Sequence, residues 1–107
     1  MKQHGNLLES IPPSWGKEIF TDLARGDTVR IERIVSTGQT SPETGWYDQA
    51  EHEWVLVIQG AAEVTFDDGM VHRLQKGDYL TIPAHSRHRV SWTATDRRTV
   101  WVAVFYS

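Results

Sequence analysis

Short apolar or alternating segments, separated by Gly and Pro turns, run through most of the chain. Residues 28–36 place Val29 and Ile31 on one side and polar residues on the other, until the alternation shifts at Arg33. A bulge or a twist near Arg33 would explain that shift. The segments are rich in Val, Ile, Thr, Trp and Tyr, which favour pleated, half-buried strands. The pattern therefore predicts an all-β protein.

The second half of the chain repeats this pattern more strongly. Residues 53–58 form a near-continuous apolar run, which is typical of a strand covered on both faces. Gly60 ends the run, and residues 63–66 and 70–74 flank an Asp-Asp-Gly turn, which predicts a hairpin. In residues 99–106 both alternating sets are apolar, so another sheet or another subunit is expected to cover the second face. Further strands are expected at 79–82 and 88–92, with a loop at 83–87 between them.

Strands at such regular, short spacing favour a sandwich or a barrel, in which closure removes exposed sheet edges. A chain of 107 residues suits a single folded unit. Residues 1–27 carry the weakest strand pattern, and we interpret them as an N-terminal arm that packs on a barrel formed by residues 28–107. Five tryptophans indicate large aromatic packing, part of it at a subunit interface, so we expect a homodimer.

Composition narrows the possible partners and ligands. A net charge of −3 and a pI near 5.9 provide no basic field for nucleic acid. The chain has no apolar run of the length that a membrane span or a signal peptide requires, so we expect a cytoplasmic, soluble protein with no membrane partner. Because cysteine is absent, any bound metal must use nitrogen and oxygen ligands.

Two segments carry the candidate chemistry. Polar residues crowd the start of the apolar strand in residues 45–54, and Gly60 follows Glu53 by seven positions. In the second segment, Gly77, Pro83 and His88 stand at the intervals of the second motif of the cupin family. The chain resembles that family between about residues 45 and 90. The resemblance implies a double-stranded β-helix (cupin, jelly-roll) barrel.

In metal-binding cupins, two His, a Glu and a later His hold one divalent ion. The resemblance gives Glu53 the position of the family's Glu and His88 that of the later His. The first motif is degenerate here: its two His positions fall on Trp46 and Asp48 or, with the other spacing, on Tyr47 and Gln49.

His52 is an alternative to Glu53, because some cupins place a His at that neighbouring position. Strand neighbours point to opposite faces, so both can face the barrel interior only if a bulge intervenes. Residues 48 and 52 would lie about 13 Å apart in a straight strand, so a shared metal also requires a bend between them. The sequence leaves open which of the two residues faces inward.

The expected site therefore combines a metal centre and a substrate rim. The predicted cofactor is one divalent ion, Zn, Fe, Mn or Ni. The predicted metal ligands are His88, Glu53, His52, Asp48 and Gln49. The predicted substrate contacts are Tyr47, Trp46 and His85, the last at a position where the cupin motif usually has Gly.

Two functional hypotheses fit this site. The first is a metal-dependent oxygenase, isomerase or lyase that acts on a small polar molecule. The second is a metal-free cupin that binds a small ligand or sugar without catalysis, and a purely structural protein with an occluded barrel is a third possibility. All but the third require His88 and the acidic cluster before Trp54 to converge inside the barrel.

Overall fold

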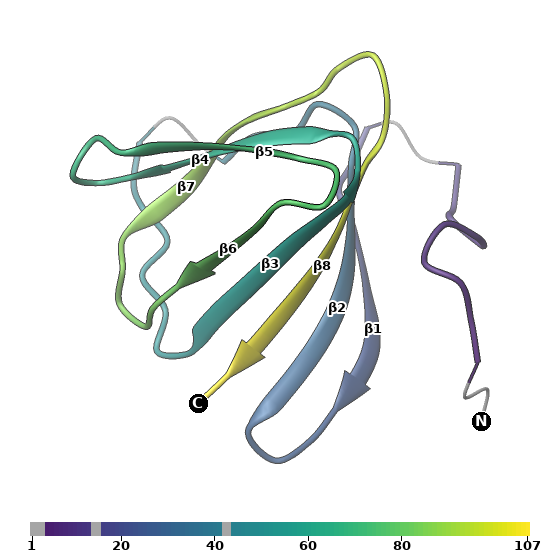
Figure 1. Ribbon diagram of the computed structural model, residues 1–107, viewed down its shortest axis with the longest axis horizontal. Coiled ribbons are helices and arrows are strands. Elements are labelled where there is room, and N and C mark those ends of the chain that lie inside the picture. The colour runs from purple at the N-terminus through teal and green to yellow at the C-terminus, as the bar shows by residue number, and fades with distance from the viewer. Residues whose placement is uncertain (1–3, 14–15, 42–43) are drawn as a thin grey trace.

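Eight strands form the regular structure of the protein, which we describe from a computed structural model (Figure 1). The structure describes residues 4–13, 16–41 and 44–107. The strands are β1 (Ile19–Arg25), β2 (Val29–Ser36), β3 (His52–Gln59), β4 (Ala61–Phe66), β5 (Val71–Gln75), β6 (Tyr79–Ile82), β7 (His88–Thr93) and β8 (Thr99–Tyr106). The described residues contain no helix with the length and hydropathy of a membrane span.

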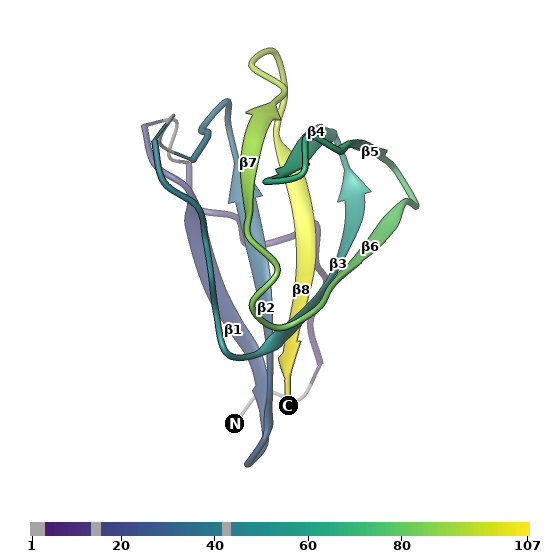
Figure 2. The same ribbon diagram turned by 90° about the vertical axis from the view of Figure 1, so that its left-hand side faces the viewer.

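The strands form two antiparallel sheets that face each other (Figures 1 and 2). The larger sheet has the order β1-β2-β8-β3-β6, and the smaller one has the order β5-β4-β7. The prediction of an all-β fold is confirmed, and the predicted hairpin at residues 63–74 is β4 and β5. Strand β8, whose two alternating sets are both apolar, lies in the middle of the larger sheet.

No bulge interrupts β2 near Arg33, whereas the twist that the sequence also allowed stays a prediction. Strands β2 and β8 pair without interruption from Val29↔Tyr106 to Ser36↔Thr99, and the irregularity lies in the neighbouring strand β1 instead. The alternation shifts at this point because β2 is covered on both faces there: Glu32 and Arg33, which are consecutive, are both buried. A strand covered on both faces need not alternate.

The N-terminal segment contributes both a strand of the larger sheet and a stretch of chain that packs outside it. Strand β1 pairs with β2, so the larger sheet extends into the part of the chain predicted as an arm. The preceding residues lie outside this sheet, where the guanidinium of Arg33 donates to the carbonyl oxygens of Leu7, Glu9 and Ser10. Arg33 is only 6% exposed, so these carbonyls take the place of water around its charge.

The core lies between the two sheets, and its buried residues are Val55, Val57, Ala62, Val64, Leu74, Ile82, Trp101, Ala103 and Phe105. The turn from β3 to β4 closes over this core at Gly60, whose φ is 92°. A Cβ at Gly60 would lie 2.5 Å from Oγ1 of Thr99, closer than any normal contact. Glycine is therefore required there both for its backbone conformation and for space.

Candidate functional site

A cavity with a volume of about 310 Å³ borders this core. Its walls combine apolar side chains, among them Phe20, Val55, Trp101 and Phe105, with a set of polar ones. The polar residues that line it are Glu18, Arg30, Glu32, Tyr47, Gln49, Glu53 and His88. An apolar pocket with a few convergent polar groups is the usual form of a small-molecule site.

His88 and Glu53 meet at this cavity although they are 35 positions apart in the sequence. Nε2 of His88 lies 3.6 Å from Oε1 of Glu53, and the two side chains are 5% and 12% exposed. Strand β3 turns Glu53 inward, and β7 begins at His88 on the facing sheet. The structure therefore brings together the two residues on which the predicted site depends.

The hydrogen bond to Ser86 orients the imidazole of His88. The carbonyl oxygen of Ser86 lies 2.8 Å from Nδ1, and a carbonyl only accepts, so Nδ1 carries a proton. Nε2 is then the nitrogen that gains or loses a proton beside Glu53. Burial lowers the pKa of His88, but the contacts with Glu53 and Ser86 outweigh burial and raise the pKa above its ordinary value.

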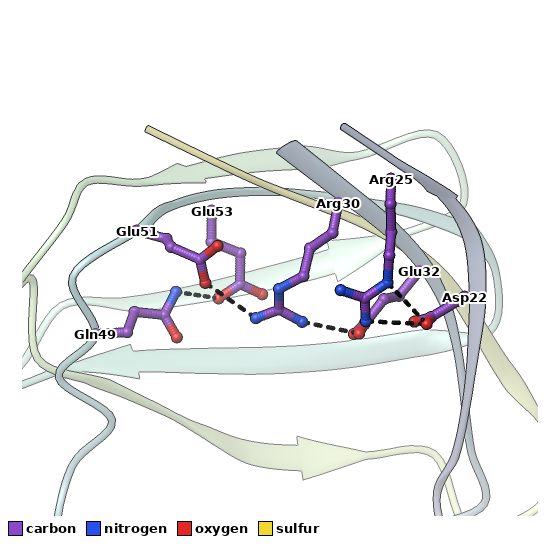
Figure 3. Close-up of polar contacts among 7 residues, drawn as sticks. All are labelled: Asp22, Arg25, Arg30, Glu32, Gln49, Glu51 and Glu53. Atoms are coloured by element: carbon purple, nitrogen blue, oxygen red, sulfur yellow. Dashed lines mark hydrogen bonds and ion pairs between the residues drawn. The ribbon is translucent and has the colours of Figure 1, made fainter. Parts of the chain in front are cut away.

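Gln49 and Tyr47 complete this end of the cavity. Nε2 of Gln49 donates to Oε1 of Glu53 at 3.0 Å, as Figure 3 shows. The backbone of Tyr47 exchanges two hydrogen bonds with the backbone of His88, and the two rings lie 5.8 Å apart. The main chain thus ties the two motif segments together, which fixes the position of His88 relative to Gln49 and Glu53.

His52 lies on the other face of β3 and does not line the cavity. Its Nδ1 accepts a hydrogen bond from the backbone N–H of Ala84 at 3.0 Å, and its ring packs 5.2 Å from that of Tyr106. The pairing of β3 with β8 keeps strict alternation at Glu53, with no bulge between the neighbours. Of the two residues that the sequence left open, Glu53 faces inward and His52 faces outward.

Asp48 and His85 form a separate pair on the surface. Oδ1 of Asp48 lies 2.7 Å from Nδ1 of His85, and the side chains are 41% and 69% exposed. Nε of Arg87 lies 3.7 Å from the other oxygen of Asp48. The backbone of His85 has a φ of 61°, which explains why cupins usually place Gly at this position. Neither residue lines the cavity.

Trp46 also lies outside the cavity, with its ring 4.8 Å from the guanidinium carbon of Arg89. The predicted residues therefore divide into two groups. Tyr47, Gln49, Glu53 and His88 line the cavity, whereas Trp46, Asp48, His52 and His85 do not.

Sequence reasoning missed a second polar cluster, which contributes Arg30 and Glu32 to the cavity lining. Arg30 lies between Glu32 and Glu51, with its terminal nitrogens 2.8 Å and 3.0 Å from their carboxylates (Figure 3). The hydrogen bond that Arg30 donates to Glu51 is the largest cause of the raised pKa of Arg30. The sequence signal was the alternation of Arg30 and Glu32 with apolar residues in β2. In this strand the polar side faces the cavity.

The donors that converge at His88 do not fit a closed metal centre. They are one imidazole, one carboxylate and the amide of Gln49, and Nε2 of that amide already donates to Glu53. Across the described parts of the chain, no group of three or more His, Cys, Asp or Glu side chains could hold a metal ion. Protein metal sites of the catalytic type use at least three such ligands in most cases.

Comparison with known proteins places this barrel in a family. The Cupin domain family matches residues 32–105. The chain therefore belongs to the cupin family, which confirms the resemblance found in its motifs and the expected double-stranded β-helix. No curated protein matches the chain by sequence.

Several solved structures share the fold. A candidate mannose-6-phosphate isomerase from Ralstonia eutropha JMP134 is 42% identical, with 97% of each chain covered and a TM-score of 0.92. A cupin superfamily protein from Desulfitobacterium hafniense DCB-2 is 22% identical over 99% of this chain and 93% of the other, with a TM-score of 0.78. An RmlC-like cupin with a double-stranded β-helix fold from Methanocaldococcus jannaschii is 15% identical over 90% and 85%, with a TM-score of 0.70. The last two show similarity of fold alone.

Proposed function

We propose that this cupin binds a small polar molecule of the sugar class in its cavity, held by Gln49, Glu53 and His88 without a metal ion. The observation that carries the proposal is the buried Glu53–His88 pair facing the cavity. Burying a carboxylate and an imidazole is costly unless they have partners, and a ligand in the cavity would supply further hydrogen bonds.

The chemistry of the walls favours hydroxyl groups. Carboxylates only accept hydrogen bonds, whereas the amide of Gln49 and the imidazole of His88 both donate and accept. Hydroxyl groups satisfy both kinds of partner, and apolar walls such as Val55 and Trp101 suit the C–H faces of a sugar ring. The name of the Ralstonia eutropha protein, which is 42% identical, supports the same ligand class.

The geometry of the pair also favours a second, catalytic version of this function, in which the chain interconverts aldose and ketose sugars. Glu53 would remove a proton from the carbon next to the carbonyl, while protonated His88 would donate a proton to the carbonyl oxygen. Glu53 then returns its proton to the former carbonyl carbon, while the hydroxyl on the carbon that Glu53 deprotonated loses its proton to His88, which completes the isomerisation. Proton exchange with D₂O at that carbon, followed by NMR, tests this version.

Binding is tested with a panel of neutral monosaccharides and their phosphate esters by saturation-transfer NMR. At least one member is expected to bind the wild type, and its affinity is expected to fall at least about tenfold in Glu53→Gln, because a hydrogen bond to a charged group is lost. Glu63→Gln is the matched control, since Glu63 lies on β4 and does not line the cavity. Absence of binding by every member, or equal binding by Glu53→Gln, would overturn the proposal.

The metal-free part of the proposal is tested by elemental analysis of protein purified without added metal, alongside His88→Ala. We expect far less than one ion per chain in both. Stoichiometric metal in the wild type that is lost in His88→Ala would overturn this part and favour the metal-dependent hypothesis.

A further inference from the structure

The charges around the cavity indicate which form of a sugar it accepts. Three carboxylates, those of Glu18, Glu32 and Glu53, line the cavity. Among the described lining residues, Arg30 is the one permanently charged cation that faces them. Three carboxylates and one guanidinium give the lining a formal charge of −2 when the imidazole of His88 is neutral and −1 when it is protonated, so the lining is negative in both states.

Arg30 is already paired with two carboxylates. Its Nη1 donates to Oε2 of Glu32 at 2.8 Å, and its Nη2 donates to Oε1 of Glu51 at 3.0 Å. Figure 3 shows both carboxylates beside Arg30. The guanidinium carbon also lies 3.9 Å from the ring centroid of Phe105, so the ring covers one face of the guanidinium. A phosphate binds Arg best through two parallel N–H groups, and here each terminal nitrogen of the guanidinium already donates to a carboxylate that would repel the phosphate.

Resting on the proposed function, we infer that the cavity selects an uncharged, polyhydroxylated ligand and rejects its phosphate ester. A phosphate group carries between about one and a half and two negative charges near neutral pH. In the cavity it would meet three carboxylates, and Arg30 is already paired with one of them, Glu32, and with Glu51 outside the lining. Hydroxyl groups, in contrast, donate to those carboxylates. This chain would therefore differ in ligand from what the name of the Ralstonia eutropha protein states for that protein.

The test compares mannose with mannose-6-phosphate as probes on the wild-type protein by isothermal titration calorimetry. Mannose is expected to bind at least about tenfold more tightly, since like charges held close together in a partly buried site repel strongly. Glu51→Gln sharpens the test, because Glu51 does not line the cavity and the substitution removes one of the two negative charges paired with Arg30. This variant is expected to bind the phosphate more tightly and mannose as before. Glu63→Gln is expected to leave both affinities unchanged.

The possible failures are distinguishable. Equal or tighter binding of mannose-6-phosphate by the wild type overturns the inference about charge and leaves the proposed function standing. If mannose does not bind but another sugar of the panel does, the same ratio is measured for that sugar and its phosphate. If no sugar and no phosphate binds, the proposed function itself fails.

Discussion

His88 with Glu53 and His85 with Asp48 are two histidine–carboxylate pairs built from the same two segments of the chain. The outer pair has the shorter contact, 2.7 Å against 3.6 Å, yet its side chains are 69% and 41% exposed. The inner pair is 5% and 12% exposed and faces the cavity. Water competes for the outer contact and screens it, so its shorter distance adds little to stability or function.

The comparison shows that burial decides which of two similar pairs can carry a function. The inner pair is ordered by further partners, the amide of Gln49 and the carbonyl of Ser86. The outer pair has Arg87 as an exposed neighbour, 3.7 Å away. The following predictions challenge this contrast, beginning with the largest expected effect.

Replacing each histidine by alanine should separate the two pairs most clearly. His88→Ala removes the partner of a buried carboxylate and enlarges the cavity, so the free energy of unfolding is expected to fall by about 3 kcal/mol. His85→Ala is expected to change it by less than about 0.5 kcal/mol. Urea unfolding measures both values. Losses of equal size in the two variants would contradict the contrast.

The stability of the inner pair should depend on pH. Burial alone lowers the pKa of His88. Glu53 and Ser86 raise it by more than burial lowers it, so the pKa lies above the ordinary value of 6.5. The pair therefore stabilises the fold fully below about pH 6.5, and this contribution is lost as the pH rises through the raised pKa of the folded state. Unfolding of the wild type and Glu53→Gln across this range is expected to show a difference that shrinks toward alkaline pH. A difference independent of pH would contradict the assignment.

His85→Gly tests whether the outer histidine is needed at all. A non-glycine residue at a φ of 61° costs about 1 kcal/mol, whereas the exposed contact with Asp48 contributes about 0.5 kcal/mol or less. Because glycine is also more flexible when unfolded, the expected change lies between zero and a gain of about 0.5 kcal/mol. Thermal unfolding measures it. A clear loss of stability would show that the outer pair matters more than its exposure indicates.

Asp48→Asn should have the smallest effect. The substitution keeps the shape of the side chain and removes its charge. The side chain of Asp48 is 41% exposed and lies outside the cavity. Both the free energy of unfolding, within about 0.5 kcal/mol, and sugar binding are expected to stay at wild-type values. Weaker sugar binding by Asp48→Asn in saturation-transfer NMR would place the outer pair in the binding site.

Much of the fold could be predicted from the sequence because the strands are short and separated by strong turn signals. Gly60 and the Asp-Asp-Gly turn mark the ends of β3 and β4, and the two apolar sets of β8 indicate a strand in the middle of a sheet. The shift of alternation near Arg33 could not be explained from the sequence, because the sequence does not show that a cavity lies on one side of β2 and the N-terminal segment on the other.

The candidate site was predictable only in part. The motif spacing identified His88 and Glu53, but the sequence could not decide between His52 and Glu53, which requires the register of β3 against β8. Arg30 and Glu32 were overlooked because polar positions of a strand usually face solvent. In this barrel they face inward, as the pairing of β2 with β8 places them on the same side as Phe105.

The most direct measurement is an NMR titration of the His88 ring in the wild type and in Glu53→Gln. A buried imidazole that faces a carboxylate is expected to have a pKa above its ordinary value, and that pKa is expected to fall when Glu53 becomes an amide. Addition of a sugar that binds is expected to shift the same resonances. A His88 pKa that is identical in the two proteins, with resonances unmoved by any sugar, would contradict the account of a buried pair at a ligand-binding cavity.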